Sequence, residues 1–226
     1  MYICDMYSAA EENYLKALFT LANKKGEVSP NDLSKRLGTK MPTVNSMMKK
    51  LAEKKLVHYE SYKPLKLTET GQKDAALILR KHRLTEMFLV EKMGFGWENV
   101  HEIAEQIEHI KSSIFFDKMD ELLGYPKFDP HGSPIPDKNG RINAPEYISL
   151  SECNVDDTVK FMAISDSSES FLKFLNSKNM QLGQLFKILS VEKFDGTMNL
   201  KFENGTEETL SNIVCEKMLV TRIKKK

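Results

Sequence analysis

Cysteine is scarce in this sequence, and its few positions form no recognisable framework. The three cysteines, Cys4, Cys153 and Cys215, are odd in number and far apart along the chain. This distribution excludes a disulfide-stapled scaffold, and it contains no Cys-x-x-Cys pair of the kind that builds zinc knuckles. It favours a protein of a reducing compartment.

Long apolar runs are missing as well. No window approaches the roughly 18 consecutive apolar residues of a membrane span, and the N-terminal segment MYICDMYSAAEENYLK has no signal-peptide hydrophobic region. We therefore expect a cytoplasmic protein without a membrane partner. What is present, 41% hydrophobic and 29% charged residues over 226 positions, is typical of a globular protein with one large or two to three small domains.

The net charge is small, at +1, but the charges are unevenly distributed. Between residues 29 and 68, nine basic residues stand against three acidic ones, which gives +6 and leaves −5 for the rest of the chain. A basic patch on an otherwise mildly acidic protein is typical of a nucleic-acid footprint. A lysine-rich helix face exposed to solvent would give the same count, so charge alone leaves both interpretations open.

The N-terminal region has the pattern of a winged helix-turn-helix. A capping box at Ser8 begins a helix that is expected to extend to about Lys24. A short helix from Ser29 to Gly38 and a second one opening at Pro42 are separated by a tight turn. The alternating segment LVHYESYKPLKLT that follows predicts a two-stranded wing.

The N-terminal end of the second short helix carries hydrogen-bonding and basic side chains. Such side chains can reach phosphates and base edges in the major groove of double-stranded DNA. The expected DNA contacts are Thr39, Lys40, Pro42, Thr43, Asn45, Ser46 and Lys49. The alternative is a winged helix that is used only for protein contact.

Histidine and glutamate recur at helical spacing between residues 79 and 116. His82 and Glu86 are one turn apart on one helix. On the next helix, at about 100° per residue, four side chains point from a narrow arc at roughly 0°, 40°, −20° and 80°. These four are His101, Glu105, Glu108 and His109. Imidazoles and carboxylates without thiolates favour a divalent ion such as manganese or iron(II); the alternative is a polar face exposed to solvent.

Apolar residues of the same region predict two further faces. One is formed by Ile103, Ile107 and Ile110, opposite the arc of histidines and glutamates. The preceding helix carries more apolar surface than a single helix can bury, which favours a homodimer. Its members are Met87, Phe88, Val90 and Met93.

The last hundred residues change in character. The stretch from Pro126 to Pro145 is rich in Pro, Gly, Asp and Asn and predicts a linker, in which His131 is expected to be exposed or in a turn and is given no function. Short strand patterns follow, with hairpin signals at Asp195-Gly196 and Asn204-Gly205. They predict a small SH3-like barrel of four or five strands.

The expected fold class is therefore mainly α with small β parts. We expect a winged helix-turn-helix DNA-binding domain at 1–72, a helical metal-binding and dimerisation domain at 73–125, a linker at 126–148 and the SH3-like domain at 149–226.

An enzyme is the competing class. The segment from His101 to Glu105 is a near miss to the zinc-protease motif HExxH, but its fifth residue is Glu. Glu98 and His101 form one Glu-x-x-His pair, whereas a di-iron carboxylate bundle needs two. We therefore expect no enzyme and no small-molecule substrate. A winged-helix regulator that senses an organic ligand is a third possibility.

Four segments in this order resemble one known family. They are RLGTKMPTVNSMMKKLAEKKLV, LTETGQ, RKHRLTEMFL and VHEIAEQIEH. Together with the C-terminal barrel pattern, they make nearly the whole chain similar to the diphtheria toxin repressor family of metal-dependent transcriptional regulators, including its manganese transport regulator branch. The resemblance implies a homodimer that binds palindromic operator DNA and represses metal-uptake genes with a metal ion as corepressor.

The resemblance also implies two metal sites. The ancillary site would use His82, Glu86 and His101, completed by a side chain of the barrel, for which Glu169 is the choice here. The primary site would use Glu105, Glu108, His109 and, from the first helix, Asn13.

Two positions bear on the choice of metal. Iron-responsive members often have Cys at the place of Glu105, so the glutamate implies manganese, with iron(II) as the alternative. Members with a binuclear manganese cluster have a carboxylate where this chain has Lys16, so the resemblance does not extend to such a cluster.

Overall fold

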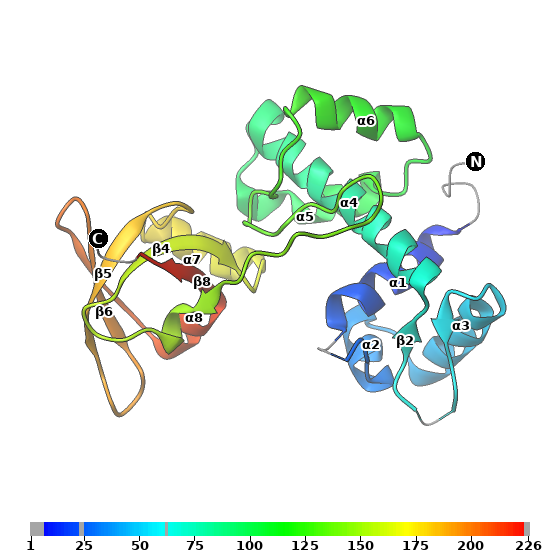
Figure 1. Ribbon diagram of the computed structural model, residues 1–226, viewed down its shortest axis with the longest axis horizontal. Coiled ribbons are helices and arrows are strands. Elements are labelled where there is room, and N and C mark those ends of the chain that lie inside the picture. Colours follow the sequence, from blue (N-terminus) through cyan, green and yellow to red (C-terminus); the bar gives the residue numbers. More distant parts are fainter. Residues whose placement is uncertain (1–6, 23–24, 62, 224–226) are drawn as a thin grey trace.

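The computed structural model describes residues 7–22, 25–61 and 63–223. It contains an N-terminal helix-turn-helix with a wing, a helical middle part and a C-terminal antiparallel sheet, which lie one after another along the molecule (Figure 1). The expected fold class is confirmed. Cys4 lies outside the described residues, and so does Lys24, the expected end of the first helix.

The helix-turn-helix forms as its local signals predict. At Ser8 the side chain accepts from the Glu11 N–H and the Glu11 carboxylate accepts from the Ser8 N–H, so the capping box is present. Gly38 ends the second helix in the left-handed conformation, at φ 60°, which glycine adopts without strain. The elements are α1 (Ala9–Leu21), α2 (Pro30–Leu37), α3 (Met41–Glu53) and the wing strands β1 (Val57–His58) and β2 (Lys66–Leu67).

The core under these elements is apolar and fully enclosed. Leu15 of α1, Leu33 of α2 and Val44 and Met48 of α3 have no exposed surface. Each such side chain contributes about 1.5–3 kcal/mol by its removal from water. The recognition helix α3 is therefore held against α1 and α2 by packing, which leaves its other face free.

A single long helix, α4 (Glu69–Met93), connects the wing to the middle part of the molecule (Figure 1). The Thr68 side chain caps its start by accepting from the Gly71 N–H. A Cβ at Gly71 would overlap the Leu56 carbonyl oxygen, so glycine permits the close approach of α4 to the wing. No helix among the described residues is long and apolar enough to span a membrane.

The middle part is completed by η2 (Trp97–Asn99), α5 (His101–Ile107) and α6 (Ser113–Leu122). Helix α5 is shorter than the sequence suggested, because Glu108 is already its C-cap. The most buried positions of this segment are not the isoleucines, since Ala104 and Glu108 are fully buried, whereas Ile107 is only partly buried against a neighbouring apolar cluster and Ile110, beyond the end of α5, is 40% exposed. The burial of Glu108 has a physical reason: α4 presents His82, which offers it a hydrogen-bond partner.

The segment from 126 to 145 has little regular structure, as expected, but it is firmly attached to α4. Arg80 donates to the Pro136 carbonyl at 2.7 Å, and Arg83 donates to the Pro134 carbonyl at 2.5 Å. His131 lies in a turn, one of its two expected positions, but the other expectation, an exposed side chain, is wrong, because the side chain is buried, at 3% exposure. The arginines of α4 draw the segment onto the helix and turn this histidine inward.

The C-terminal part is a six-stranded antiparallel sheet in the order β3-β8-β4-β5-β6-β7 around its own apolar core. Both predicted hairpins are confirmed, β5 to β6 around Asp195-Gly196 and β6 to β7 around Asn204-Gly205. The described elements are β3 (Ile148–Ser149), η3 (Leu150–Glu152), β4 (Thr158–Ile164), α7 (Glu169–Ser177), β5 (Leu185–Val191), β6 (Met198–Phe202), β7 (Glu207–Leu210), α8 (Asn212–Lys217) and β8 (Met218–Arg222).

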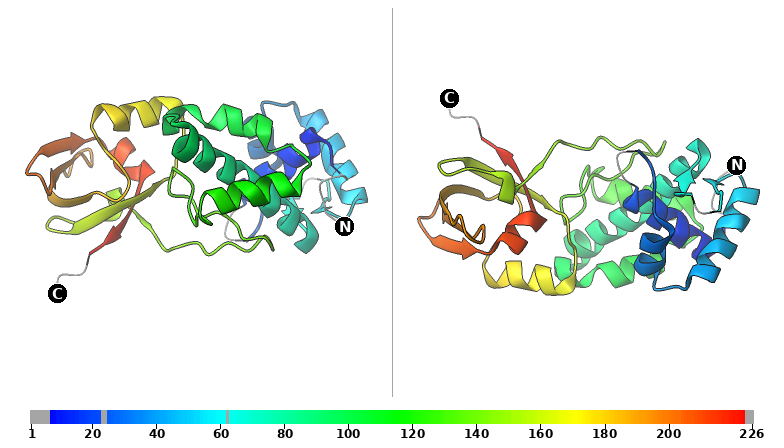
Figure 2. Two further views of the ribbon diagram at one scale, coloured as in Figure 1. Left: turned by 90° about the horizontal axis from the view of Figure 1, so that it is seen from above. Right: turned by 90° about the horizontal axis from the view of Figure 1, so that it is seen from below.

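The sheet domain is attached to the helical part at two places. The Trp97 indole donates to the Asn176 side chain at 2.7 Å, and the Ile164 N–H donates to the His131 carbonyl at 3.1 Å. Gly132, at φ 83°, passes so close to strand β4 that a Cβ would lie 2.7 Å from the Ala163 Cβ. Figure 2 shows the extended segment running beside the helices into the sheet.

Candidate metal centre

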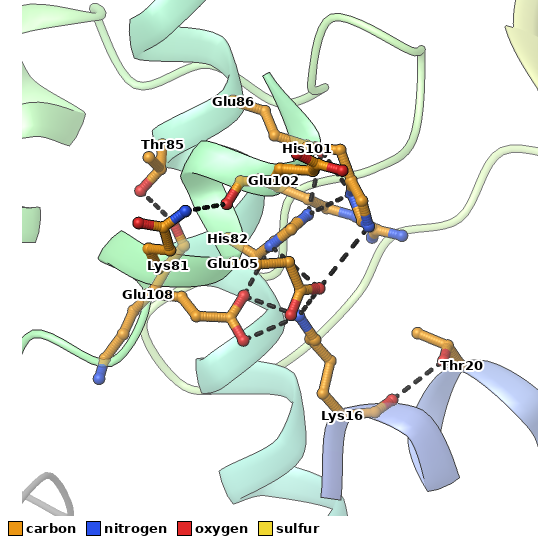
Figure 3. A network of polar contacts seen from close by, with 12 residues as sticks. Lys16, Thr20, Lys81, His82, Thr85, Glu86, His101, Glu102, Glu105 and Glu108 are labelled. Carbon is orange, nitrogen blue, oxygen red and sulfur yellow. Dashed lines mark hydrogen bonds and ion pairs between the residues drawn. The ribbon is translucent and has the colours of Figure 1, made fainter. Parts of the chain in front are cut away.

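Helices α4 and α5 bring the first predicted ligand group together (Figure 3). His82 and Glu86 are one turn apart on α4, with Nε2 of His82 3.0 Å from Oε1 of Glu86. His101, the first residue of α5, places Nδ1 3.2 Å from both His82 Nε2 and Glu86 Oε1. Their ligand atoms lie within 4.8 Å of one another, as in a metal site.

A second group lies directly beside the first and shares His82. Nδ1 of His82 is 2.6 Å from Oε2 of Glu108, and Glu105 completes the group. The ammonium of Lys16, from α1, is within 2.8 Å of both Glu108 oxygens and 2.5 Å from Oε1 of Glu105 (Figure 3). Lys16 thus links the first helix to α5 through two carboxylates.

A third group was not expected from the sequence. Glu86, Asp129 and His131 are all buried, and their ligand atoms lie within 4.8 Å of one another. His131 places Nδ1 3.7 Å from Oε2 of Glu86, while its Nε2 is 2.9 Å from the Trp97 carbonyl. Because Glu86 belongs to the first and third groups, its two oxygens face different sets of partners.

The acidic and imidazole side chains of these groups shift one another's pKa values. Burial lowers the pKa of His82, but hydrogen bonds with Glu108 and Glu86 outweigh it and raise the pKa to about 9. Burial raises the pKa of Glu86, yet the surrounding His101, His131 and His82 hold it well below its usual range. Burial, together with the Glu86 charge, raises the pKa of Asp129 to about 6. The buried carboxylates therefore favour the charged forms of His82 and His131.

The three groups do not include Asn13 or His109, the two remaining residues of the predicted primary site. Among the residues that the structure describes, no partner lies within hydrogen-bonding distance of the buried Oδ1 of Asn13. His109 instead pairs its Nδ1 with Glu12 at 2.5 Å, and its Nε2 is 3.7 Å from Glu108. Glu12 was not singled out from the sequence; its position next to Asn13 on the first helix was the available signal.

A cavity of about 440 Å³ connects these groups. Its walls also include Ser165 and Ser167, which come from the C-terminal part. Glu169, the expected ligand of that part, is not among the described residues that line the cavity. It begins α7 at the surface, where its exposed carboxylate pairs with Lys173 at 2.6 Å.

The donor atoms fit a divalent ion of intermediate hardness. They are carboxylate oxygens and imidazole nitrogens, with an unpartnered amide oxygen at Asn13, and the described cysteines, Cys153 and Cys215, are buried in the core of the sheet domain instead. Manganese and iron(II) suit such a set better than thiolate-preferring ions do. A cation would also relieve the mutual repulsion of buried carboxylates.

The predicted DNA contacts gather at the start of α3. Lys40 is its N-cap, and the exposed positions of its first turns include Thr43 and Ser46. Thr39 is half-buried, with its hydroxyl 3.1 Å from that of Tyr14 on α1. Asn45 is half-buried, and Pro42 and Lys49 are exposed.

Comparison with known proteins agrees with this architecture. Residues 6–65 match the model of the iron-dependent repressor N-terminal DNA-binding domain, and residues 68–137 match that of the iron-dependent repressor metal-binding and dimerisation domain. A solved structure described as a manganese-dependent transcriptional repressor in complex with manganese superposes with a TM-score of 0.87 at 31% identity, covering 94% of this chain and all of the other.

Two relatives are similar over about half of the chain. The iron-dependent repressor IdeR of Mycobacterium tuberculosis (strain ATCC 25618 / H37Rv) is 32% identical over 125 residues, which are 55% of this chain and 54% of IdeR. The HTH-type transcriptional regulator MntR of Geobacillus thermodenitrificans is 30% identical over 120 residues, 53% of this chain and 84% of MntR. The chain thus matches about half the length of its IdeR-type relatives.

Fold and centre together define a winged helix-turn-helix protein that carries a carboxylate–imidazole cluster and a small C-terminal sheet domain. This chain belongs to the iron-dependent repressor family, the family of the diphtheria toxin repressor and of the manganese transport regulators. The resemblance seen in its sequence motifs is confirmed.

Proposed function

We propose that this protein is a manganese-activated, DNA-binding transcriptional repressor of metal-uptake genes, in which the ion acts as corepressor. The observation that carries the proposal is the meeting of α1, α4 and α5 at one cluster of carboxylates and imidazoles, within the part of the chain that also carries the helix-turn-helix. Family membership supports the same function, and it supports a binding protein rather than an enzyme.

The proposed ligands combine the sets that the family resemblance implies with the contacts seen in the structure. One set is His82, Glu86 and His101, with Asp129 and His131 on the other side of Glu86. The other set is Glu105, Glu108 and His109, with the unpartnered Oδ1 of Asn13 from α1. Manganese is favoured over iron(II) because Glu105 supplies oxygen where a thiolate would favour softer ions.

The proposed mechanism connects this cluster to DNA through α1. With a divalent ion held by the second of these ligand sets, the carboxylates would be neutralised and α1 would be tied to α5 through Asn13 instead of through the Lys16 ammonium. Helix α1 packs on α2 and α3 and bonds Thr39 through Tyr14, so its position determines that of the recognition helix. In a homodimer, the two recognition helices must be about 34 Å apart, or a multiple of this, to enter successive major grooves of a palindromic operator.

The homodimer is proposed to form through the helical middle part. Large apolar side chains there remain exposed, among them Ile114 at 79%, Met93 at 58% and Leu122 at 54%. Exposed apolar groups of this size mark association surfaces. Within each subunit we propose the domain limits 1–72, 73–125, 126–148 and 149–226. We also propose a cytoplasmic location.

The test is DNA binding by fluorescence anisotropy at fixed salt, with and without manganese, iron(II), zinc and cobalt. Manganese should strengthen operator binding by the wild type and have little effect on Glu108→Ala, because Glu108 is fully buried and contacts both Lys16 and His82. Glu108→Gln, whose side chain is closer in shape to glutamate, should respond to manganese as little as Glu108→Ala does. Glu102→Ala, an exposed position of the same helix, is the matched control and should respond as the wild type does.

Two results would count against the proposal. A wild-type protein whose DNA affinity is the same with every metal would exclude a metal-activated repressor and favour a regulator that senses an organic ligand. A Glu108→Ala variant with the full manganese response would remove Glu108 from the ligand set while leaving the function in place.

A further inference from the structure

Lys16 is the only described residue of α1 that places a positive charge inside the carboxylate cluster. Its side chain is 11% exposed, and its Nζ lies 2.5 Å from Oε1 of Glu105 and 2.8 Å from each oxygen of Glu108. The ammonium has three N–H donors and no more. All three therefore have acceptors on these two glutamates.

The Lys16 ammonium neutralises the two carboxylates, which is what a bound metal ion does in a metal site. Glu108 has no exposed surface, and Glu105 is about one-third exposed, so their charges need a nearby cation in the folded protein. Burial raises the pKa of Glu105, but the hydrogen bond and charge of Lys16 outweigh it and lower the pKa. Lys16 also connects α1 to the end of α5, two elements about ninety residues apart in the sequence.

The Glu86 side of the centre has a different set of neighbours. Among the described residues, Glu86 is paired with His82, His101 and His131, and no lysine reaches it. Arg83 pairs with Asp129 at 3.3 Å and donates to the Pro134 carbonyl, so its charge acts on Glu86 only from a distance. A neutral imidazole offers a nitrogen lone pair to a metal ion, so the neighbours of Glu86 are themselves potential ligands, whereas a lysine ammonium has no lone pair and cannot coordinate a metal.

We propose that Lys16 is a built-in competitor for divalent ions at Glu105 and Glu108. In the metal-free protein its ammonium occupies the space between the two carboxylates and holds α1 to α5. An ion can use both glutamates only after Nζ has moved away, so these glutamates bind ions more weakly than the cluster around Glu86 does. Lys16 thereby sets the metal concentration at which the second set of ligands is filled.

This inference rests on the proposed metal-dependent function, and its test is a manganese titration of the full-length protein. Free manganese is followed by its electron paramagnetic resonance signal, which bound ions lose. The wild type should show a tighter and a weaker class of sites. Lys16→Met should tighten the weaker class by roughly tenfold or more, because removal of a buried charge partner is worth more than the free energy of a tenfold change in affinity. The tighter class should stay unchanged.

Three further variants isolate the charge of Lys16. Lys16→Gln removes the charge but keeps an N–H donor toward Glu108, and it should tighten the weaker class as Lys16→Met does. Lys16→Arg keeps the charge and should bind as weakly as the wild type or more weakly. Lys81→Met makes the same change at a lysine of α4 whose Nζ points away from the cluster toward the Ile110 carbonyl (Figure 3), and it should have no effect.

Thermal unfolding supplies a second measurement that does not depend on site classes. In chelator, Lys16→Met and Lys16→Gln should melt below the wild type, since the buried Glu108 and the partly exposed Glu105 have lost their cation. Manganese should raise the melting temperatures of both variants by more than it raises that of the wild type. A Lys16→Met protein that folds only with manganese would support the same conclusion.

The outcomes separate the two proposals. If both charge-removing variants bind manganese no more tightly than the wild type, Lys16 is not a competitor, although the metal-dependent function stands. If the wild type binds a single tight class that includes Glu105 and Glu108, the inference is likewise overturned. If the wild type binds no manganese, the proposed function fails first.

Discussion

Raising the pH of the metal-free protein should discharge His82 with a midpoint at about pH 9, well above the ordinary value of 6.5 for histidine. Burial opposes the charged form, but the carboxylates of Glu108 at 2.6 Å and Glu86 at 3.0 Å favour it more strongly. The nearby Lys16 charge acts in the opposite direction and does not reverse the result.

The magnitude follows from linkage between proton binding and folding. A pKa raised from 6.5 to about 9 at a buried imidazole corresponds to roughly 3 kcal/mol of folding free energy. Because the folded pKa is the higher one, this stabilisation is fully present below about pH 6.5 and is lost as the pH rises through about 9. His131 is shifted in the same direction, chiefly by Glu86 against the effect of burial, and adds to the loss.

The assay is an NMR titration of histidine-labelled protein in chelator, with the signal of His82 identified by its absence from His82→Asn. Glu108→Gln should lower the His82 midpoint, because it removes the strongest partner that favours the charged form. Urea unfolding in chelator should show stability falling between about pH 6.5 and about pH 9. A wild-type midpoint below about pH 7 would refute the reasoning, and so would a midpoint that Glu108→Gln leaves unchanged.

Three other perturbations test separate contacts. Tyr14→Phe, which removes the hydroxyl 3.1 Å from that of Thr39, should weaken manganese-activated DNA binding by about 1 kcal/mol without changing manganese affinity, as anisotropy and metal titration would show. Gly132→Ala, strained at φ 83° and too close to Ala163, should loosen the sheet domain by about 1–3 kcal/mol and increase its release in limited proteolysis. The Cys215 thiol, whose pKa burial raises to about 12, should resist alkylation until the sheet domain unfolds, as mass spectrometry would detect.

Much of the fold is encoded in local signals and was therefore predictable. The capping residues Ser8 and Thr68 and the glycines Gly38 and Gly94 mark the ends of helices within a few residues, because each satisfies backbone groups or adopts a left-handed conformation that its neighbours cannot. The hairpins of the sheet domain follow from Asn-Gly and Asp-Gly turns for the same reason.

Elements without such signals were missed. Strand β3 has only two residues, and it forms because β8 offers it a free edge. Strand β7, Glu-Glu-Thr-Leu, has no apolar alternation of its own and was predicted only through the hairpin signal at Asn204-Gly205, after which it pairs with β6. Helix α5 ends at Ile107 although no glycine or proline follows it directly, since the burial of Glu108 beside Lys16 and His82 governs its end.

The candidate metal centre likewise has one part that local sequence patterns predict and one part that they do not. Helical spacing predicted that His82 and Glu86 share a face, and the structure brings them to His101. His131 was missed because its role depends on a contact across 45 positions with Glu86, which no local pattern encodes. An Asp-x-His pair inside an otherwise turn-rich segment, Asp129 and His131, was the one available signal.

Because α4 is 25 residues long, the position of the wing is sensitive to small tilts of this helix at the cluster. At about 1.5 Å per residue, the run from Gly71 at the wing to His82 at the cluster is a rod of roughly 16 Å, so a tilt of about 10° at the cluster moves the wing by nearly 3 Å. Such an angle is reached by small changes in ligand position. In the proposed homodimer, the spacing of the two recognition helices would therefore depend on the angle of α4 at the cluster, and the rigidity of α4 between wing and cluster would determine how much of a change in that angle reaches the wing.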